Sequence, residues 1–175
     1  MTADAPAGFR IRAAIPADAP VILEMIRALA EYEKAPNDAV VTEEQIRETL
    51  FGAHRSAEVV LACEGEVPVG FAVFFHNYST WLGRAGLYLE DLFVRPNARG
   101  RGYGRRLLAH LAMLAEQRGC LRMEWSVLDW NASAIGFYRA IGANPMDEWT
   151  VYRLTGPALS ALAREAGERH GDWTT

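Results

Sequence analysis

The hydrophobic positions near the N-terminus first follow the period of a strand and then that of helices. Phe9 to Ala13 alternates apolar and polar residues, which predicts a strand. Thr42 and Gln45 have the spacing of a capping box and predict a later helix that ends near Phe51. Between these segments, Pro16 to Glu33 predicts a helix whose apolar residues share one face: Val21, Ile22, Met25, Ile26, Leu29 and Ala30.

The middle of the chain carries strand patterns. Ala57 to Cys63 and Val67 to His76 are apolar runs on either side of the turn residues Gly65-Glu66, so they predict a hairpin. Asn77 to Gly86 has the composition of a loop, and Leu87 to Val94 predicts the next strand.

The remainder alternates helical and strand patterns. Gly102 to Arg118 predicts a helix with a leucine-rich inner face. A short helix is predicted over Ala132 to Ile141, between strands at Leu121 to Leu128 and Glu148 to Leu154, and a terminal helix over Pro157 to Ala166. The order β-α-α-β-β-β-α-β-α-β predicts one mixed α/β domain over residues 9–166, after a disordered N-terminus (1–8) and before a loose tail (167–175).

Composition narrows the class of protein. A chain of 175 residues that is 50% hydrophobic suits one domain, and its net charge of −4 argues weakly against nucleic acid as a partner. No apolar run approaches the ~20 residues of a membrane span, so no membrane association is expected. Cys63 and Cys120 lie in apolar contexts, which predicts buried free thiols and a cytoplasmic location. The histidines lack the spacing of metal ligands, so no metal is expected.

The segment Arg99 to Gly104 (RGRGYG) follows an apolar strand and opens a helix. Its glycines let the backbone approach a ligand without interference from Cβ atoms. Their amides and the helix N-terminus favour an anion, and Arg99 and Arg101 add positive charge. The pattern indicates a phosphate-bearing ligand, although alone it also fits a flexible turn. A P-loop does not fit, because Gly104 is followed by two arginines, and the spacing and late strand disfavour a dinucleotide fingerprint.

The loop matches the motif R/Q-x-x-G-x-G/A of the GNAT superfamily of N-acetyltransferases, and a second match runs from Asn131 to Tyr138 (NASAIGFY). The chain resembles this superfamily over about Phe9 to Leu154. The resemblance implies a GNAT fold with a mixed, mostly antiparallel sheet of about six to seven strands, flanked by about four helices. It also implies acetyl-CoA as co-substrate and a homodimer with active sites near the subunit interface.

Within the superfamily, the chain is similar to the diamine (spermidine/spermine) acetyltransferases and their thialysine-acetylating relatives. The matching segments are Leu29 to Glu33, Trp81 to Gly83, Tyr88 to Val94 and Val127 to Asn131. The diamine enzymes carry an acidic residue and a proline before the tryptophan, where this chain has Ser79-Thr80. The difference removes one anionic contact for a long polyamine and leaves a thialysine- or lysine-like amine open.

The resemblance assigns cofactor binding to three segments. The end of a strand would present backbone groups to the acetyl-pantetheine arm, the glycine loop would hold the pyrophosphate, and the start of the later helix would line the far side of the CoA. In that order, the residues are Leu92, Phe93 and Val94; Arg99, Gly100, Arg101, Gly102, Tyr103, Gly104 and Arg105; and Asn131, Ala132, Ser133 and Ala134.

Amine acetylation needs a base for an ammonium of pKa about 10 and a proton donor for the departing thiolate. By resemblance Tyr138 is the general acid, whereas without the motif it is interpreted as a core aromatic beside Phe137. Glu90 is the candidate base, acting directly or through water. Neighbouring strand residues point to opposite faces, so Glu90 and Asp91 are expected on different sides.

Substrate binding is assigned to acidic and aromatic residues that suit a cationic chain, although each alone is also interpreted as structural: Tyr32, Glu33, Trp81, Asp91, Glu124, Trp125 and Glu148. The sequence thus predicts an acetyl-CoA-dependent acetylation of a primary amine on a small cationic substrate. A non-catalytic CoA-binding regulatory module and an enzyme acting on protein or peptide amines remain alternatives. A non-catalytic module needs neither Tyr138 nor Glu90.

Overall fold

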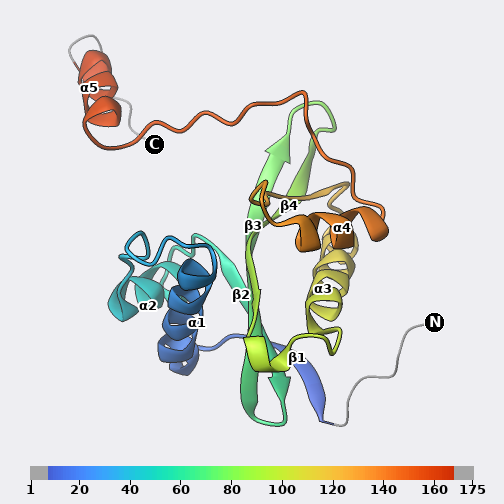
Figure 1. Ribbon diagram of the computed structural model, residues 1–175. Helices are drawn as coiled ribbons and strands as arrows, with labels where there is room; N and C mark the ends of the chain where they lie inside the picture. The colour runs from blue at the N-terminus through green and yellow to red at the C-terminus, as the bar shows by residue number, and fades with distance from the viewer. Residues whose placement is uncertain (1–7, 168–175) are drawn as a thin grey trace. The chain divides into compact units, whose positions relative to one another are not determined.

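The computed structural model describes residues 8–167, which group into two compact units, 8–126 and 127–167. Figure 1 shows both units, and each is described by itself here. Within the described residues, no helix is long and apolar enough to cross a membrane.

The first unit is built on a five-stranded sheet in the order β1-β2-β3-β4-β5. Neighbouring strands are antiparallel except for the parallel pair β4 and β5. The strands are β1 (Phe9–Ala13), β2 (Glu58–Glu64), β3 (Val67–Ser79), β4 (Arg84–Val94) and β5 (Met123–Trp125).

Helices cover both faces of this sheet (Figure 1). One face carries α1 and α2, and the other carries α3. The helices are α1 (Ala19–Tyr32), which follows the short 3-10 helix η1 (Pro16–Asp18), α2 (Glu43–Phe51) and α3 (Tyr103–Gln117), which follows η2 (Pro96–Ala98). The Thr42 side chain caps α2 with Gln45, so the predicted capping box is confirmed.

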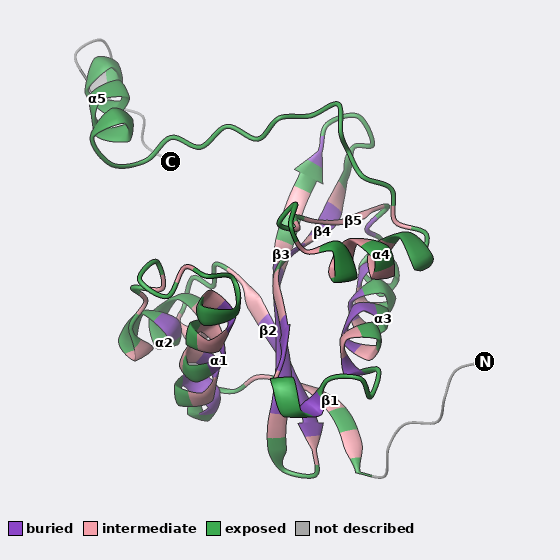
Figure 2. Cartoon of the chain, in the orientation of Figure 1, coloured by how far each residue is buried: buried purple, intermediate pink, exposed green. Residues whose placement is uncertain are grey.

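The core lies between the sheet and its helices, as the buried positions in Figure 2 show. Ile22, Met25 and Leu29 of α1 pack with Phe71 of β3 and Phe93 of β4, so the periodic apolar face of α1 is the face that the sheet buries. On the other side, α3 buries Leu107, Leu108 and Leu111. Cys63 and Cys120 are buried and free, as the sequence predicts.

The second unit contains α4 (Ala132–Ala140) and α5 (Gly156–Gly167). The predicted strand at Glu148 to Leu154 is wrong: these residues have no regular structure and are exposed. A strand needs a neighbour to pair its backbone groups, and residues 127–167 contain no strand. The residues of this segment alternate as in a strand, but within this unit there is no second strand to pair with it.

The hairpin of β3 and β4 is longer than its sequence pattern indicates. The predicted loop at Asn77 to Gly86 is mostly paired strand, with Asn77 opposite Gly86 and Ser79 opposite Arg84. A tight turn allows this, because Gly83 has a φ of 61° and donates its N–H to the Ser79 carbonyl at 2.8 Å. The mixed α/β class is confirmed: residues 8–167 contain five strands instead of six or seven and five α-helices instead of four.

A buried ion pair joins β1 to the start of α1. Arg12 donates two hydrogen bonds to Asp18, at 2.6 and 2.8 Å, and the Ile15 N–H donates a third at 2.8 Å. These donors hold the pKa of the Asp18 carboxyl below its usual value. Because only 8% of Asp18 is exposed, loss of its charge leaves Arg12 without compensation.

We expect Asp18→Asn to lower the free energy of unfolding by about 2 kcal/mol at pH 7. A carboxyl with a lowered pKa stabilises the fold above its unfolded pKa of about 4 and loses that contribution as the pH falls through the lowered value. The deficit should therefore shrink in urea titrations below about pH 4. Glu66→Gln, which removes the exposed pair with Arg10, is the control and should change little; an equal effect of both variants contradicts the assignment.

Candidate active site

The centre of the site is an irregularity in β4. Val73 of β3 lies opposite Asp91, but the next β3 residue, Phe74, lies opposite Leu89. Glu90 is therefore an extra residue, a β-bulge. A bulge disrupts the ladder locally and redirects side chains, and bulges are frequent beside active sites.

The expectation that Glu90 and Asp91 lie on opposite faces stays a prediction, because the bulge leaves Glu90 without a partner on β3. Asp91 pairs with Val73, which packs in the core cluster against α1, so Asp91 lies on the α1 side of the sheet. Glu90 is exposed, yet its charge acts on Asp91. The inserted residue breaks the alternation on which the expectation depends.

Three carboxyl groups gather at this point. Burial, followed by the charges of Glu90 and Glu33, raises the pKa of Asp91 to about 6. Burial also raises the pKa of Glu33. The structure thus brings together Glu33 from the end of α1 with Glu90 and Asp91 from β4, as an acidic group of residues that the sequence assigns to the amine.

The end of α1 holds Glu33 and Tyr32 in place through its backbone. Lys34 has a φ of 63°, the left-handed conformation that ends a helix. The Glu33 N–H donates to the Leu29 carbonyl at 2.9 Å and the Ala35 N–H to the Ala30 carbonyl at 2.9 Å. The residue after the acidic side chain thus turns the chain sharply, and no sequence signal at Lys34 indicates this turn.

The edge of β4 beyond Glu90 is available for pairing. The parallel ladder with β5 covers only Leu87 to Leu89, opposite Met123 to Trp125. Within residues 8–126, no strand pairs with Glu90 to Val94 on that side. This is where the sequence assigns the acetyl-pantetheine arm, beside Leu92, Phe93 and Val94. Phe93 itself is a core side chain, so only its backbone is available.

The glycine loop connects the end of β4 to α3. Gly100 and Gly102 have φ values of 77° and 79°, which favour glycine. A Cβ atom at either position would meet no atom within 4 Å, so their backbones border open space. Gly102 is the N-cap of α3, and the first amides of that helix follow it. The loop therefore has the backbone conformation and helix N-terminus of an anion site.

Two side chains of the loop point away from such an anion and fix the loop to the sheet. Arg101 forms an ion pair with Glu64 at the end of β2, at 2.7 Å. The Tyr103 hydroxyl donates to the same Glu64 oxygen at 2.6 Å, and the buried Tyr103 ring stacks on Phe9 at 4.7 Å. Of the predicted cofactor residues, Arg101 and Tyr103 thus offer their backbone, and Arg105 is exposed at the helix start.

The second unit carries the other predicted cofactor residues and the predicted acid. Asn131 caps α4 by accepting the Ala134 N–H at 3.2 Å, with Ala132 and Ser133 in the first turn. Tyr138 lies on the same helix, half-buried, with its ring 5.6 Å from that of Phe137. The capping explains why an asparagine begins this segment.

The remaining predicted substrate residues do not join the acidic group within the first unit. Trp81 is 87% exposed in the turn between β3 and β4. Glu124 accepts a hydrogen bond from Asn77 at 2.9 Å and lies 3.0 Å from Arg122, so its charge has partners already. Trp125 is half-buried opposite Leu89, and Glu148 is an exposed residue of the second unit.

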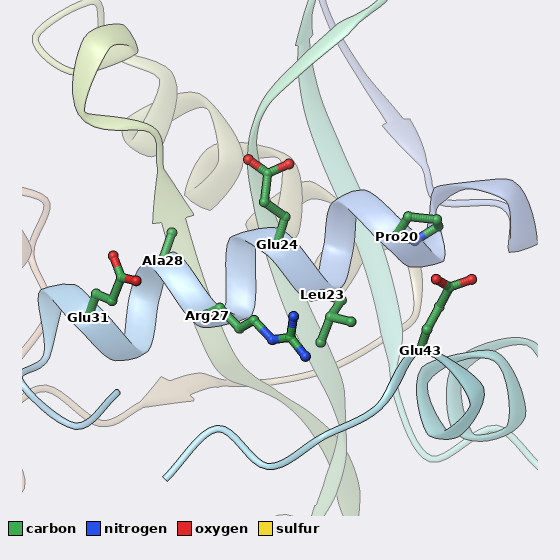
Figure 3. Close-up of a pocket in the computed structure, with 7 residues that line it drawn as sticks. All are labelled: Pro20, Leu23, Glu24, Arg27, Ala28, Glu31 and Glu43. Atoms are coloured by element: carbon green, nitrogen blue, oxygen red, sulfur yellow. The ribbon is translucent and has the colours of Figure 1, made fainter. Parts of the chain in front are cut away.

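A hollow of about 480 Å³ lies elsewhere, along α1 and the start of α2 (Figure 3). None of its lining residues is a predicted site residue: they are Pro20, Leu23, Glu24, Arg27, Ala28, Glu31 and Glu43. Glu24 also pairs with Arg95, which follows β4, at 2.7 Å. The hollow therefore marks the outer side of the helix that carries Glu33.

A mixed sheet with an open strand edge and a glycine loop that starts a helix is compatible with an acyltransferase that binds a phosphate-bearing co-substrate. The model of the acetyltransferase (GNAT) family matches residues 23–143, and the chain belongs to this family of N-acetyltransferases. The family uses acetyl-CoA as co-substrate. The resemblance drawn from the loop and the Asn131 to Tyr138 segment is confirmed.

The chain is also similar to individual proteins of known name. The chain is 38% identical to a thialysine N-epsilon-acetyltransferase of Bos taurus, over 87% of this chain and 96% of the relative. It is 32% identical to an L-ornithine N5-acetyltransferase of Arabidopsis thaliana, over 87% of each. An integron cassette protein from the mobile metagenome of V. cholerae is 28% identical with a TM-score of 0.77, covering 91% of this chain and 99% of that one.

We expect Asp91→Asn to stabilise the fold, in contrast to Asp18→Asn. A carboxyl whose pKa is raised from 3.8 to about 6 costs the folded state stability as the pH rises through that interval. The variant should therefore unfold at higher urea concentration above pH 6, with a gain of about 2 kcal/mol, and match the parent near pH 4. A gain that does not depend on pH would contradict the buried-charge explanation.

Proposed function

We propose that this N-acetyltransferase moves an acetyl group from acetyl-CoA to a primary amine of a small cationic substrate, by direct attack in a ternary complex. The substrate class is a polyamine or diamine, or a thialysine- or lysine-like amine. The observation that carries the proposal is the acidic group of Glu33, Glu90 and Asp91 at the bulge, beside the open edge of β4. A group of acidic side chains next to an open strand edge suits an ammonium nucleophile.

The residues present fit a CoA pyrophosphate. The backbone of Gly100 and Gly102 borders open space, and the first amides of α3 follow them. The free edge from Glu90 to Val94 suits a pantetheine arm, whose amides can pair with it as a strand would. Asn131 to Ala134 would line the far side of the CoA. Bound acetyl-CoA supplies the activated acetyl group.

The acidic side chains bind the amine and remove its proton. Glu33 and Asp91 supply negative charge in a partly buried place, where an ammonium is held more strongly than in water. Glu90, exposed at the bulge, accepts the ammonium proton directly or through a water. The backbone N–H near Leu92 donates to the oxyanion that develops on the acetyl group. Tyr138 then donates a proton to the departing thiolate.

The turn before Trp81 favours a short amine within this class. Ser79-Thr80 stands where the diamine enzymes have an acidic residue and a proline, and Ser79 is 5% exposed and accepts the Leu82 N–H at 3.3 Å. Its hydroxyl is thus engaged in the turn and adds no charge for a distant second amine. The relatives named for thialysine and ornithine support the same choice. The cytoplasmic location and the homodimer stay predictions.

The direct test is release of the CoA thiol from acetyl-CoA in the presence of lysine, thialysine, ornithine, putrescine, spermidine and a peptide with a free amine. We expect the amino acids with a terminal side-chain amine to give the highest kcat/KM. A preference for the peptide would support the protein-acetylating alternative. Binding of CoA with no thiol release for any amine would support the non-catalytic module and reject the proposal.

The role of Tyr138 gives a second prediction. Tyr138→Phe keeps the ring beside Phe137 but loses the proton donor, so kcat should fall by about 100-fold while the Kd of CoA stays unchanged. Tyr152→Phe is a matched control in the same unit, because Tyr152 is 92% exposed, and it should keep full turnover. Full turnover by Tyr138→Phe would show that another group donates the proton.

A further inference from the structure

Arg99 has partners different from those of the other arginine in the glycine loop. Its Nε donates to the carbonyl of Val94, the last residue of β4, at 2.9 Å. Its guanidinium carbon lies 4.6 Å from the centre of the Tyr32 ring and 5.5 Å from the centre of the Phe93 ring. Both distances are within the reach of cation–π attraction. Arg99 thus contacts the end of β4 and the end of α1.

The two rings differ in exposure. Phe93 is 3% exposed and contacts Phe71 edge-on, so the sheet core fixes it. Tyr32 is 39% exposed and is the last residue of α1, next to Glu33. Because the guanidinium is planar and lies near both rings, it links the more exposed Tyr32 ring to the buried Phe93 ring.

We propose that Arg99 is a positioning residue for the amine, which holds Tyr32 and the neighbouring Glu33 in place from the cofactor loop. The inference rests on the proposed function, because it assigns Arg99 to the amine side of that reaction. The guanidinium lies within cation–π distance of Tyr32 on the amine side and of Phe93 in the core, and the Nε hydrogen bond fixes the loop to β4. Loss of the side chain removes one contact of the Tyr32 ring, which is next to Glu33 in the chain.

Arg101 provides the matched control. It lies in the same loop and carries the same charge, but its guanidinium pairs with Glu64 at the end of β2, at 2.7 Å. If both loop arginines act only by attracting the phosphates of CoA, removal of either one should change the KM for acetyl-CoA. If Arg99 positions the amine site, the two variants should separate.

The experiment measures KM for the amine and for acetyl-CoA in steady state, with the best amine of the panel, and the Kd of CoA by calorimetry. We expect Arg99→Met to raise the amine KM about fivefold with a smaller change for acetyl-CoA. Arg101→Met, which removes the ion pair between the loop and β2, should change the KM for acetyl-CoA more than the KM for the amine. Arg99→Lys keeps the charge but loses the flat stacking surface, so it should resemble Arg99→Met.

A double-mutant cycle adds a test that a general loss of stability would not pass. Tyr32→Leu removes the ring, and Arg99→Met should then raise the amine KM little further, because its partner is already absent. Additive effects, or recovery of the parent constants in Arg99→Lys, would overturn the inference in favour of a simple charge effect. If the parent protein acetylates none of the amines in the panel, the proposed function itself is rejected, which is a separate result.

Discussion

The extra residue in β4 is the constraint on which the rest of the site depends. Because Glu90 has no counterpart on β3, Asp91 joins the α1 face while Glu90 stays exposed beside it. Pairing with β5 stops immediately before the bulge, after Leu89. The insertion places Glu90 as an extra acidic residue beside Asp91, and the end of the β5 ladder leaves the following backbone groups of β4 without a strand partner on that side within residues 8–126.

The acidic group of Glu33, Glu90 and Asp91 lowers the stability of the folded state. Glu33 and Asp91 both have raised pKa values because the surroundings of each favour its neutral form. Neighbouring interactions compensate for this loss of stability: Phe71 and Phe93 are buried in the core, and backbone hydrogen bonds hold the turn at Lys34 that ends α1. A cationic ligand would reverse the penalty, since it supplies the charge that the two carboxyls lack.

Most of the fold follows from the sequence, because the apolar faces of α1 and α3 and the cap at Thr42 are local patterns. The glycine loop was identified for the same reason, since its backbone conformation demands its residue type. The bulge was not predicted: it depends on how β3 pairs with β4, although two adjacent acids in the otherwise apolar run from Leu87 to Val94 are a signal. The partners of Arg99 and Arg101 depend on tertiary packing and have no sequence signal.

Glu64 receives both Arg101 and Tyr103, so the glycine loop is tied to β2, whereas Tyr32 and Glu33 belong to α1. These supports come from different strands and helices. Mutations at the end of α1 therefore remove only the contact between Tyr32 and Arg99, and the attachment of the loop to β2 stays in place. Members of the family can therefore change the amine that accepts the acetyl group during evolution and keep acetyl-CoA as the donor. The different amines in the names of the relatives agree with this.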